Sequence, residues 1–172
     1  MADRALVRHV SASFADALRH DSQGPCPDLE LARIQHAAYR RALADIGFEV
    51  EVLSALDDHP DACFVEDRLV AGWGQGLLTW SRAPSRRGES ASIQGAVAQR
   101  MPLMVMEGQT SGGRDGGDVS GGLDGGDVIQ LGDLLLVGLS ERTDRHGVAA
   151  LEDWTRGQGV TVRALPPSEG LH

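Results

Sequence analysis

The sequence of 172 residues lacks a long apolar segment and a basic stripe. No stretch approaches the roughly 18 consecutive apolar residues that a membrane span needs, and the N-terminus lacks the apolar core of a signal sequence. We therefore expect a cytoplasmic protein that does not enter a membrane. Its two cysteines, Cys26 and Cys63, have no metal-binding spacing, and in a reducing compartment we expect free thiols rather than a disulfide.

Acidic residues outnumber basic ones by 25 to 16, which gives a formal net charge of −9. An acidic chain without a basic stripe disfavours nucleic acid and anionic membranes as partners and favours a small cationic ligand. The apolar fraction of 41% and the charged fraction of 24% are ordinary for a globular protein. A chain of this length can bury a sizeable core, so we expect one domain over residues 1–172.

Three carboxylates flank a short apolar stretch within residues 60–67. Residues 63–65 predict a short strand, which would bring Asp61, Glu66 and Asp67 to a sheet edge. Carboxylates this close repel one another and take up protons unless a cation lies among them. A guanidinium, which pairs with carboxylates through parallel N–H donors, and a hard metal ion are both suitable. The alternative is a solvated turn after a strand.

The periodicity of the apolar residues predicts alternating strands and helices. Asp28 has the position of a helix N-cap, Gly47 that of a helix stop, and Gly132-Asp133 that of a hairpin turn. The order strand-strand-helix-strand occurs twice, which favours a repeated α/β unit over one doubly wound sheet. The predicted strands cover residues 5–10, 48–52, 69–71, 77–80, 103–106, 128–131, 134–137 and 160–164, and the predicted helices cover 28–46, 87–100 and 148–155.

A nonapeptide occurs twice in succession, at residues 111–119 and 120–128, with Arg114 of the first copy replaced by Leu123 in the second. Its glycines and aspartates are out of frame for a calcium-binding β-roll, and two copies are too few to stack. We therefore expect a flexible duplicated loop over residues 107–126 rather than a calcium site.

Several short motifs follow one another along the chain. They are Ala5–Arg8, Ser11–Phe14, Gln35-His36 with Tyr39, Pro60–Asp67, Ala83–Glu89, Leu123–Val128 and Gly138–Thr143. Together they resemble the motifs of the dimethylarginine dimethylaminohydrolases, which belong to the guanidine-modifying, or amidinotransferase, superfamily. The resemblance covers essentially the whole chain. It implies a pentein fold of five strand-strand-helix-strand blades, of which about three would be present in an incomplete domain.

The resemblance also implies how a guanidinium would be held. Glu66 and Asp67 would bind the guanidinium nitrogens, and Asp61 would lie beside the amino-acid end of the substrate. The ligand implied is a small cationic guanidino compound, either methylated arginine or arginine.

Arginines would bind the substrate α-carboxylate. By resemblance these are Arg86 and Arg142, with Arg87 as a less defined neighbour. From the residues alone, Arg86 could instead cap the following helix or pair with Glu89. Asp144 stands where the family's Arg-Thr motif usually continues with asparagine.

The nucleophile of the family is a cysteine near the C-terminus, and no cysteine of this sequence matches it. Cys63 lies in a predicted strand, where a small buried residue is the simpler interpretation, and Cys26 lies in a proline-flanked loop. The general acid/base histidine of the family aligns with His172. We therefore expect a truncated chain, inactive alone, whose open strand edges invite a complementing chain or a second copy. The implied thiol chemistry needs no cofactor and no metal.

Three functions remain open. The first is a hydrolase that converts dimethylarginine to citrulline and an amine through a covalent cysteine intermediate. The second is an arginine deiminase, which would share the guanidinium-binding acids but leave less room for N-methyl groups. The third is a non-catalytic fragment that binds guanidino compounds, or one half of a split protein.

Overall fold

The computed structural model describes residues 3–19, 24–110 and 119–167. The chain divides into two compact units, Met1–Val65 and Glu66–His172, which we call the N-terminal and C-terminal units. Each is described by itself below.

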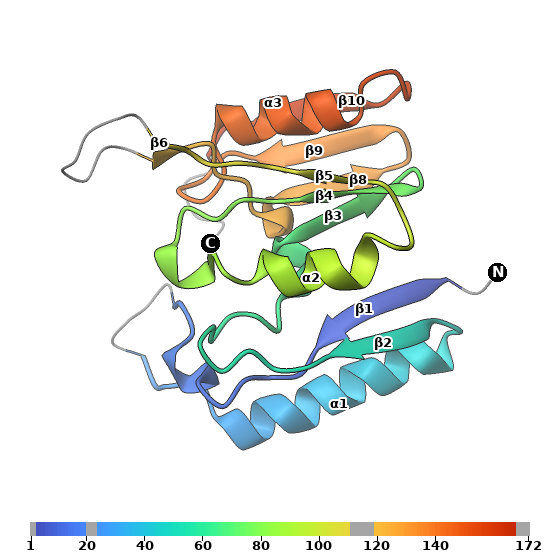
Figure 1. Ribbon diagram of the computed structural model, residues 1–172. Coiled ribbons are helices and arrows are strands. Elements are labelled where there is room, and N and C mark those ends of the chain that lie inside the picture. Colours follow the sequence, from blue (N-terminus) through green and yellow to red (C-terminus); the bar gives the residue numbers. More distant parts are fainter. Residues whose placement is uncertain (1–2, 20–23, 111–118, 168–172) are drawn as a thin grey trace. The chain divides into compact units, whose positions relative to one another are not determined.

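The N-terminal unit is built from one strand-helix-strand motif. Strand β1 (Arg4–Arg8) pairs in parallel with β2 (Glu49–Leu53), and helix α1 (Leu29–Asp45) connects them (Figure 1). A short 3₁₀ turn, Phe14–Asp16, precedes the helix. The strand-helix-strand order predicted for this part of the sequence is confirmed.

Helix α1 begins and ends where the sequence predicts. The Asp28 side chain caps it by accepting a hydrogen bond from Leu31 N at 3.0 Å, and Gly47 follows its end with a φ of 100°. None of its residues is buried, and Ile34 is 65% exposed. The apolar periodicity therefore identifies the helix, but it does not identify a buried face.

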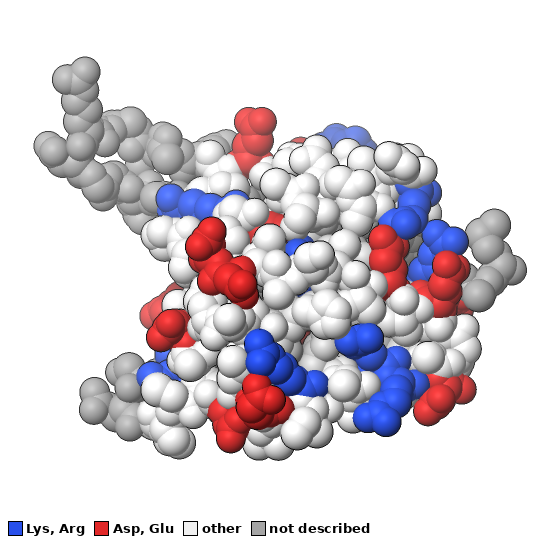
Figure 2. Space-filling model, turned by 60° about the horizontal axis from the view of Figure 1, so that its bottom comes forward, with Lys and Arg blue, Asp and Glu red and all other residues white. Residues whose placement is uncertain are grey.

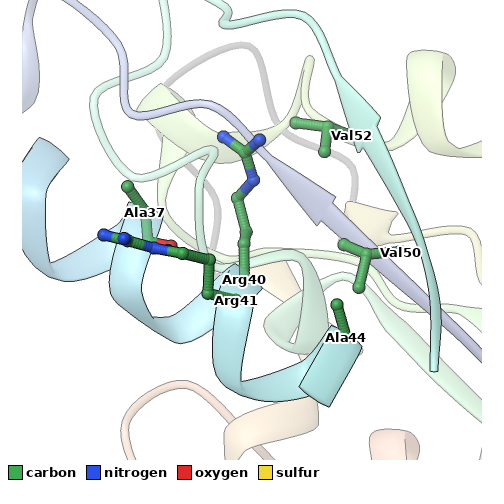
Figure 3. A pocket seen from close by; sticks show the side chains of 6 residues that line it. All are labelled: Ala37, Arg40, Arg41, Ala44, Val50 and Val52. Carbon is green, nitrogen blue, oxygen red and sulfur yellow. The ribbon is translucent and has the colours of Figure 1, made fainter. Parts of the chain in front are cut away.

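A pocket of about 400 Å³ lies between α1 and β2 (Figure 3). The side of α1 toward the strand carries small side chains and the long stem of Arg40, whose guanidinium lies near Val52, whereas Arg41 points away from the strand. The stem of an arginine can cover apolar surface while its charged head group stays in water. None of the residues that line the pocket has an apolar side chain larger than valine. The lining residues are Ala37, Arg40, Arg41, Ala44, Val50 and Val52.

The strand predicted over residues 63–65 is wrong. Residues 60–63 form turns, with local hydrogen bonds from Ala62 N to His59 O and from Phe64 N to Asp61 O, and Val65–Asp67 is a 3₁₀ helix. Local bonds of this kind use the backbone groups that a strand would offer to a neighbour. The acidic residues after this stretch therefore lie on a turn rather than at the end of a strand.

The C-terminal unit contains both predicted strand-strand-helix-strand units. In the first, β3 (Leu69–Gly72) pairs antiparallel with β4 (Gln75–Leu78), helix α2 (Ser90–Val97) follows, and β5 (Leu103–Val105) pairs in parallel with β4. Helix α2 is shorter at both ends than the helix predicted over residues 87–100, and a separate 3₁₀ helix, Pro84–Arg86, precedes it.

The second unit repeats this order. Strands β8 (Val128–Leu131) and β9 (Leu134–Gly138) form the predicted hairpin, α3 (Arg145–Trp154) follows, and β10 (Thr161–Leu165) pairs in parallel with β9. Gly132 takes the left-handed φ of 59° that the tight turn requires. Repetition of one supersecondary unit is therefore confirmed (Figure 1).

The core of the C-terminal unit lies where β4, β9 and α3 meet. Leu77, Leu135 and Leu151, one from each element, are fully buried. Burial of these side chains removes apolar surface from water and holds the two three-stranded sheets of this unit together. The same cluster includes Met106, Leu123, Val137, Val148 and Trp154.

The duplicated nonapeptide is divided by the structure. Residues 111–118 of its first copy lie outside the described residues, and a short antiparallel pair, β6 (Gln109–Thr110) and β7 (Val119–Ser120), flanks them. In the second copy residues 121–124 are all buried. These four residues belong to no helix or strand. A flexible duplicated loop over residues 107–126 stays a prediction.

Within the described residues, no helix combines the length and apolarity needed to cross a bilayer. On the face shown in Figure 2, acidic and basic side chains are interspersed, without a continuous basic area.

Replacement of a core leucine tests this packing. Leu135→Ala removes a side chain with 0% exposure and should lower the free energy of unfolding by about 2–5 kcal/mol. Leu131→Ala, in the same hairpin but at a position that is 57% exposed, should change it by less than about 1 kcal/mol. Urea titration of both variants measures the difference, and equal losses would contradict the assigned core.

Candidate functional site

The acidic turn, which we define as Glu66 and Asp67, is fixed by backbone contacts on two sides. Thr79 in the segment after β4 donates its hydroxyl to Asp67 O at 2.7 Å and its N–H to Arg68 O at 3.0 Å. On the other side, a Cβ atom added at Gly125 would overlap the Glu66 carbonyl oxygen. Only glycine permits this close approach, so the sequence Gly125-Gly126 is a packing requirement of the acidic turn.

Arg86 supplies the cation that the acidic turn requires. Its Nη1 donates to Asp67 Oδ2 at 2.6 Å, and its Nε and Nη2 donate to Glu89 at 2.9 Å each. Arg86 is 4% exposed and Glu89 1% exposed. Burial alone would lower the pKa of Arg86, but the hydrogen bonds to Glu89 and Asp67 outweigh it and raise the pKa above its ordinary value. The pairing with Glu89 that the residues alone left open is therefore present.

Glu66 differs from its neighbour because it has no partner. Among the described residues its carboxylate forms no hydrogen bond or ion pair, and the residue is exposed. Partial burial and the negative charge of Asp67 raise the pKa of Glu66 above its ordinary value. A cation arriving at Glu66 would relieve this repulsion.

A second carboxylate, Asp124, lies between two guanidinium groups. Its Oδ2 is 3.6 Å from Arg68 Nη2 and 3.6 Å from Arg142 Nε. Its Oδ1 accepts a hydrogen bond from Gly126 N at 3.1 Å. Burial and the charge of Asp67 raise the pKa of Asp124 to about 6, against the opposing effect of the two arginines.

Hydrogen bonds from the segment after β9 hold the Asp124 loop in place. Thr143 Oγ1 accepts from Asp124 N at 3.0 Å and donates to Asp127 Oδ2 at 2.6 Å. Ser140 Oγ donates to the same Asp127 oxygen at 2.7 Å. The two C-terminal motifs of the sequence thus form one polar network, which anchors the backbone on both sides of Arg142.

Asp144 joins this loop to helix α3. Its Oδ1 accepts from the N–H groups of His146 and Gly147 at the start of the helix, and its Oδ2 accepts from those of Gly121 and Gly122. Burial alone would raise the pKa of Asp144, but these four backbone donors lower it below the ordinary value. An asparagine could cap the helix, but it would lack the second accepting oxygen.

The remaining predicted site residues are placed as follows. Arg87 is exposed, with its guanidinium 4.8 Å from the centre of the Trp80 ring, and Arg142 has a side chain that is 61% exposed. Asp61 belongs to the N-terminal unit, where it is 5% exposed and accepts hydrogen bonds from Leu18 N. His172 lies outside the described residues.

The C-terminal unit therefore brings together Glu66, Asp67 and Arg86, and it connects Arg142 to them through Asp124. Sequence reasoning missed Arg68 and Asp124 as members of this cluster, although Asp124 lies in the motif Leu123–Val128. It named Glu89 only as an alternative partner of Arg86, three residues away. In the described part of the chain, no group of three or more histidine, cysteine, aspartate or glutamate side chains is arranged to hold a metal ion.

Comparison with solved structures defines the class of protein. A cysteine-to-serine variant of the dimethylarginine dimethylaminohydrolase from Pseudomonas aeruginosa, with citrulline bound, matches with a TM-score of 0.85 and 26% identity over 100% of this chain and 64% of its own. The N-terminal domain of an arginine dihydrolase from Cyanobacteria has the same fold, with a TM-score of 0.75 at 14% identity, over 95% of this chain and 58% of its own. The protein is therefore of the pentein class, as the resemblance implied.

Sequence comparison finds relatives of the same kind. The dimethylarginine dimethylaminohydrolase of Streptomyces coelicolor is 36% identical over 169 residues, which are 98% of this chain and 62% of that protein. The one from Pseudomonas aeruginosa is 30% identical over 167 residues, 97% of this chain and 62% of that protein. No protein-family model matches the chain. By sequence and fold, the chain is homologous to the dimethylarginine dimethylaminohydrolases, and it spans 62% of the length of these two relatives.

Substitution of Gly125 tests the close approach to the acidic turn. Gly125→Ala forces a methyl group against the Glu66 backbone and should lower the free energy of unfolding by about 1–3 kcal/mol. Gly95→Ala is the matched control, because nothing lies within 4 Å of a Cβ atom there and the site is inside α2. Because alanine favours a helix more than glycine does, this control should raise the free energy of unfolding by about 1 kcal/mol. An unchanged free energy of unfolding for Gly125→Ala, measured by urea titration, would contradict this close packing.

Asp144 provides a test that depends on pH. Asp144→Asn should keep the helix cap but lose the hydrogen bonds to residues 121–122. Asp144→Ala loses both sets of hydrogen bonds and should lower the free energy of unfolding by about 1–2 kcal/mol. Because folding lowers the pKa of Asp144, its contribution is present above the ordinary value and is lost as the pH falls through the lower, folded-state value. The difference in the free energy of unfolding between wild type and Asp144→Ala should therefore be constant from about pH 5 to 8 and disappear below about pH 4. Urea titrations across this range measure it, and a gap independent of pH would refute the carboxylate's role.

Proposed function

We propose that this chain carries the guanidinium-binding part of a dimethylarginine hydrolase. In this proposal the lineage chemistry is hydrolysis of a C–N bond in N-methylated arginine, which yields citrulline and an amine. The observation that carries the proposal is the Glu66 carboxylate, which is exposed, has no partner among the described residues and has a raised pKa beside Asp67. The homology to dimethylarginine dimethylaminohydrolases supports a guanidino compound as the cation that binds there.

Each side chain of the cluster has a distinct task in this proposal. Glu66 binds the guanidinium nitrogens of the ligand, and Asp67 adds a second carboxylate whose position is fixed by Arg86. All three guanidinium nitrogens of Arg86 donate to Asp67 or Glu89, so Arg86 orients the acidic turn. Arg142, 61% exposed, is the better placed to bind the α-carboxylate of the ligand. The roles of Asp61, Arg87 and His172 stay predictions, and so does the role of Arg86 in binding the α-carboxylate.

We further propose that residues 1–172 release no citrulline by themselves. The citrulline complex of the Pseudomonas aeruginosa relative has a cysteine replaced by serine, whereas both cysteines here belong to the N-terminal unit. Cys26 is exposed and Cys63 is half-buried. Catalysis would then depend on a nucleophile from a complementing polypeptide or a second copy, paired at exposed edges such as β8 with Ile129 and Leu131.

Ligand affinity tests the role of Glu66. Isothermal titration of the chain with asymmetric dimethylarginine should give binding that Glu66→Gln weakens roughly tenfold or more, since a charge-assisted hydrogen bond contributes about 1.5–3 kcal/mol. Glu152→Gln, which removes an exposed carboxylate from α3, is the matched control for net charge and should bind like wild type. Affinity should fall with decreasing pH as Glu66 takes up a proton, and this fall should begin above the ordinary glutamate value. Equal affinity of both variants would contradict the proposal.

A citrulline assay tests the second part. No release is expected from asymmetric dimethylarginine or from arginine with the purified chain. Release that persists in the double variant Cys26→Ser/Cys63→Ser would mean that another group attacks the guanidinium carbon. Release from arginine but not from dimethylarginine would favour a deiminase.

A further inference from the structure

Arg68 is a buried arginine whose guanidinium has no hydrogen bond. It is 1% exposed, and its Nε, Nη1 and Nη2 atoms all lack a hydrogen-bond partner among the described residues. Burial and the charge of Arg86 lower the pKa of Arg68, against the opposing charges of Asp124, Glu89 and Asp67. A guanidinium nevertheless keeps its proton in proteins. A buried cation of this kind persists only where a nearby anion balances its charge. Its nearest carboxylate is Asp124, at 3.6 Å.

Asp124 experiences opposing influences from the groups that face it. Burial and the charge of Asp67 favour its neutral form, whereas Arg68, Arg142 and the N–H of Gly126 favour the carboxylate. The two arginines lie at the same distance, 3.6 Å, from the same oxygen. Their surroundings differ, because the Arg68 side chain is 1% exposed and that of Arg142 is 61% exposed. Water screens the exposed charge much more strongly, so Arg68 exerts the larger effect.

We propose that Arg68 is a positioning residue of the site, which holds Asp124 as a carboxylate so that Asp124 can in turn orient Arg142. The contact of Asp124 with Nε leaves the terminal nitrogens of Arg142 for an anion from solvent. This proposal rests on the proposed function only for the identity of that anion, the α-carboxylate of the ligand. Without Arg68, Asp124 becomes protonated, its attraction for Arg142 weakens, and the exposed side chain of Arg142 is released.

We call the sequence of contacts from Arg68 through Asp124 to Arg142 the relay. Nuclear magnetic resonance tests the relay without any ligand. The ¹³C signal of the Asp124 carboxyl group, assigned by its loss in Asp124→Asn, should titrate near pH 6 in the wild-type chain. In Arg68→Met its midpoint should rise by about one pH unit or more, a tenfold weaker acid, whereas Arg68→Lys keeps the charge and should restore most of the wild-type value. The ¹⁵N signal of Arg142 Nε should follow the same midpoint in each chain. An unchanged Asp124 midpoint in Arg68→Met, or an Arg142 signal that ignores it, would overturn the proposal.

A comparison of melting temperatures decides the case if Arg68→Met does not fold. Asp124→Asn leaves the Arg68 cation buried without a counter-ion, and the double variant Arg68→Met/Asp124→Asn removes both charges. The double variant should therefore melt at a higher temperature than Asp124→Asn. A melting temperature equal to or below that of Asp124→Asn would refute the buried pair.

Ligand binding links the relay to the site. A midpoint raised from about 6 to about 7 leaves roughly half of the Asp124 carboxyl groups ionised at pH 7, instead of about nine tenths. At pH 7, Arg68→Met should therefore bind asymmetric dimethylarginine about twofold more weakly than wild type and should recover at higher pH, where Asp124 ionises again. A purely structural role of Arg68 would not produce this recovery, so a deficit that is independent of pH would count against the relay. If the wild-type chain binds no dimethylarginine, the proposed function fails, while the ligand-free titration still decides the role of Arg68.

Discussion

The buried guanidinium of Arg86 is the interaction on which the site depends. Two carboxylates of one turn cannot remain charged side by side in a partly buried position without a cation, and Arg86 provides that cation to Asp67 at 2.6 Å while Glu89 keeps its side chain in place. Glu66 is thereby left as an exposed carboxylate beside a balanced pair. Removal of Arg86 would disturb the acidic turn before it affected any ligand.

Close backbone packing aligns this turn with the other half of the site. Gly125 lies directly against Glu66, and Asp144 joins the same loop to the start of α3 through four backbone N–H groups. The carboxylate at position 144 therefore has a structural task that reaches beyond the helix cap. These contacts place Asp124 beside Arg68 and Arg142, so that charges from distant parts of the sequence meet.

Much of the fold follows from local sequence signals. The cap at Asp28, the hairpin at Gly132 and both strand-strand-helix-strand units depend on side-chain periodicity and turn preferences, which act over a few residues. The strand expected at residues 63–65 failed because three apolar residues fit a turn as well as a strand. Only hydrogen bonding with neighbours decides between the two.

The sequence by itself determined the resemblance to the dimethylarginine dimethylaminohydrolases, because it places adjacent acids at 66–67 and arginines in matching motifs. The comparisons agree with that resemblance. Tertiary structure alone decided which acid pairs with which arginine. Arg86 pairs with Asp67, and Asp124 lies between Arg68 and Arg142. Glu66 has no partner within the part of the chain that the structure describes. Coulomb attraction and desolvation depend on distance and burial, and neither quantity can be read from positions along a chain.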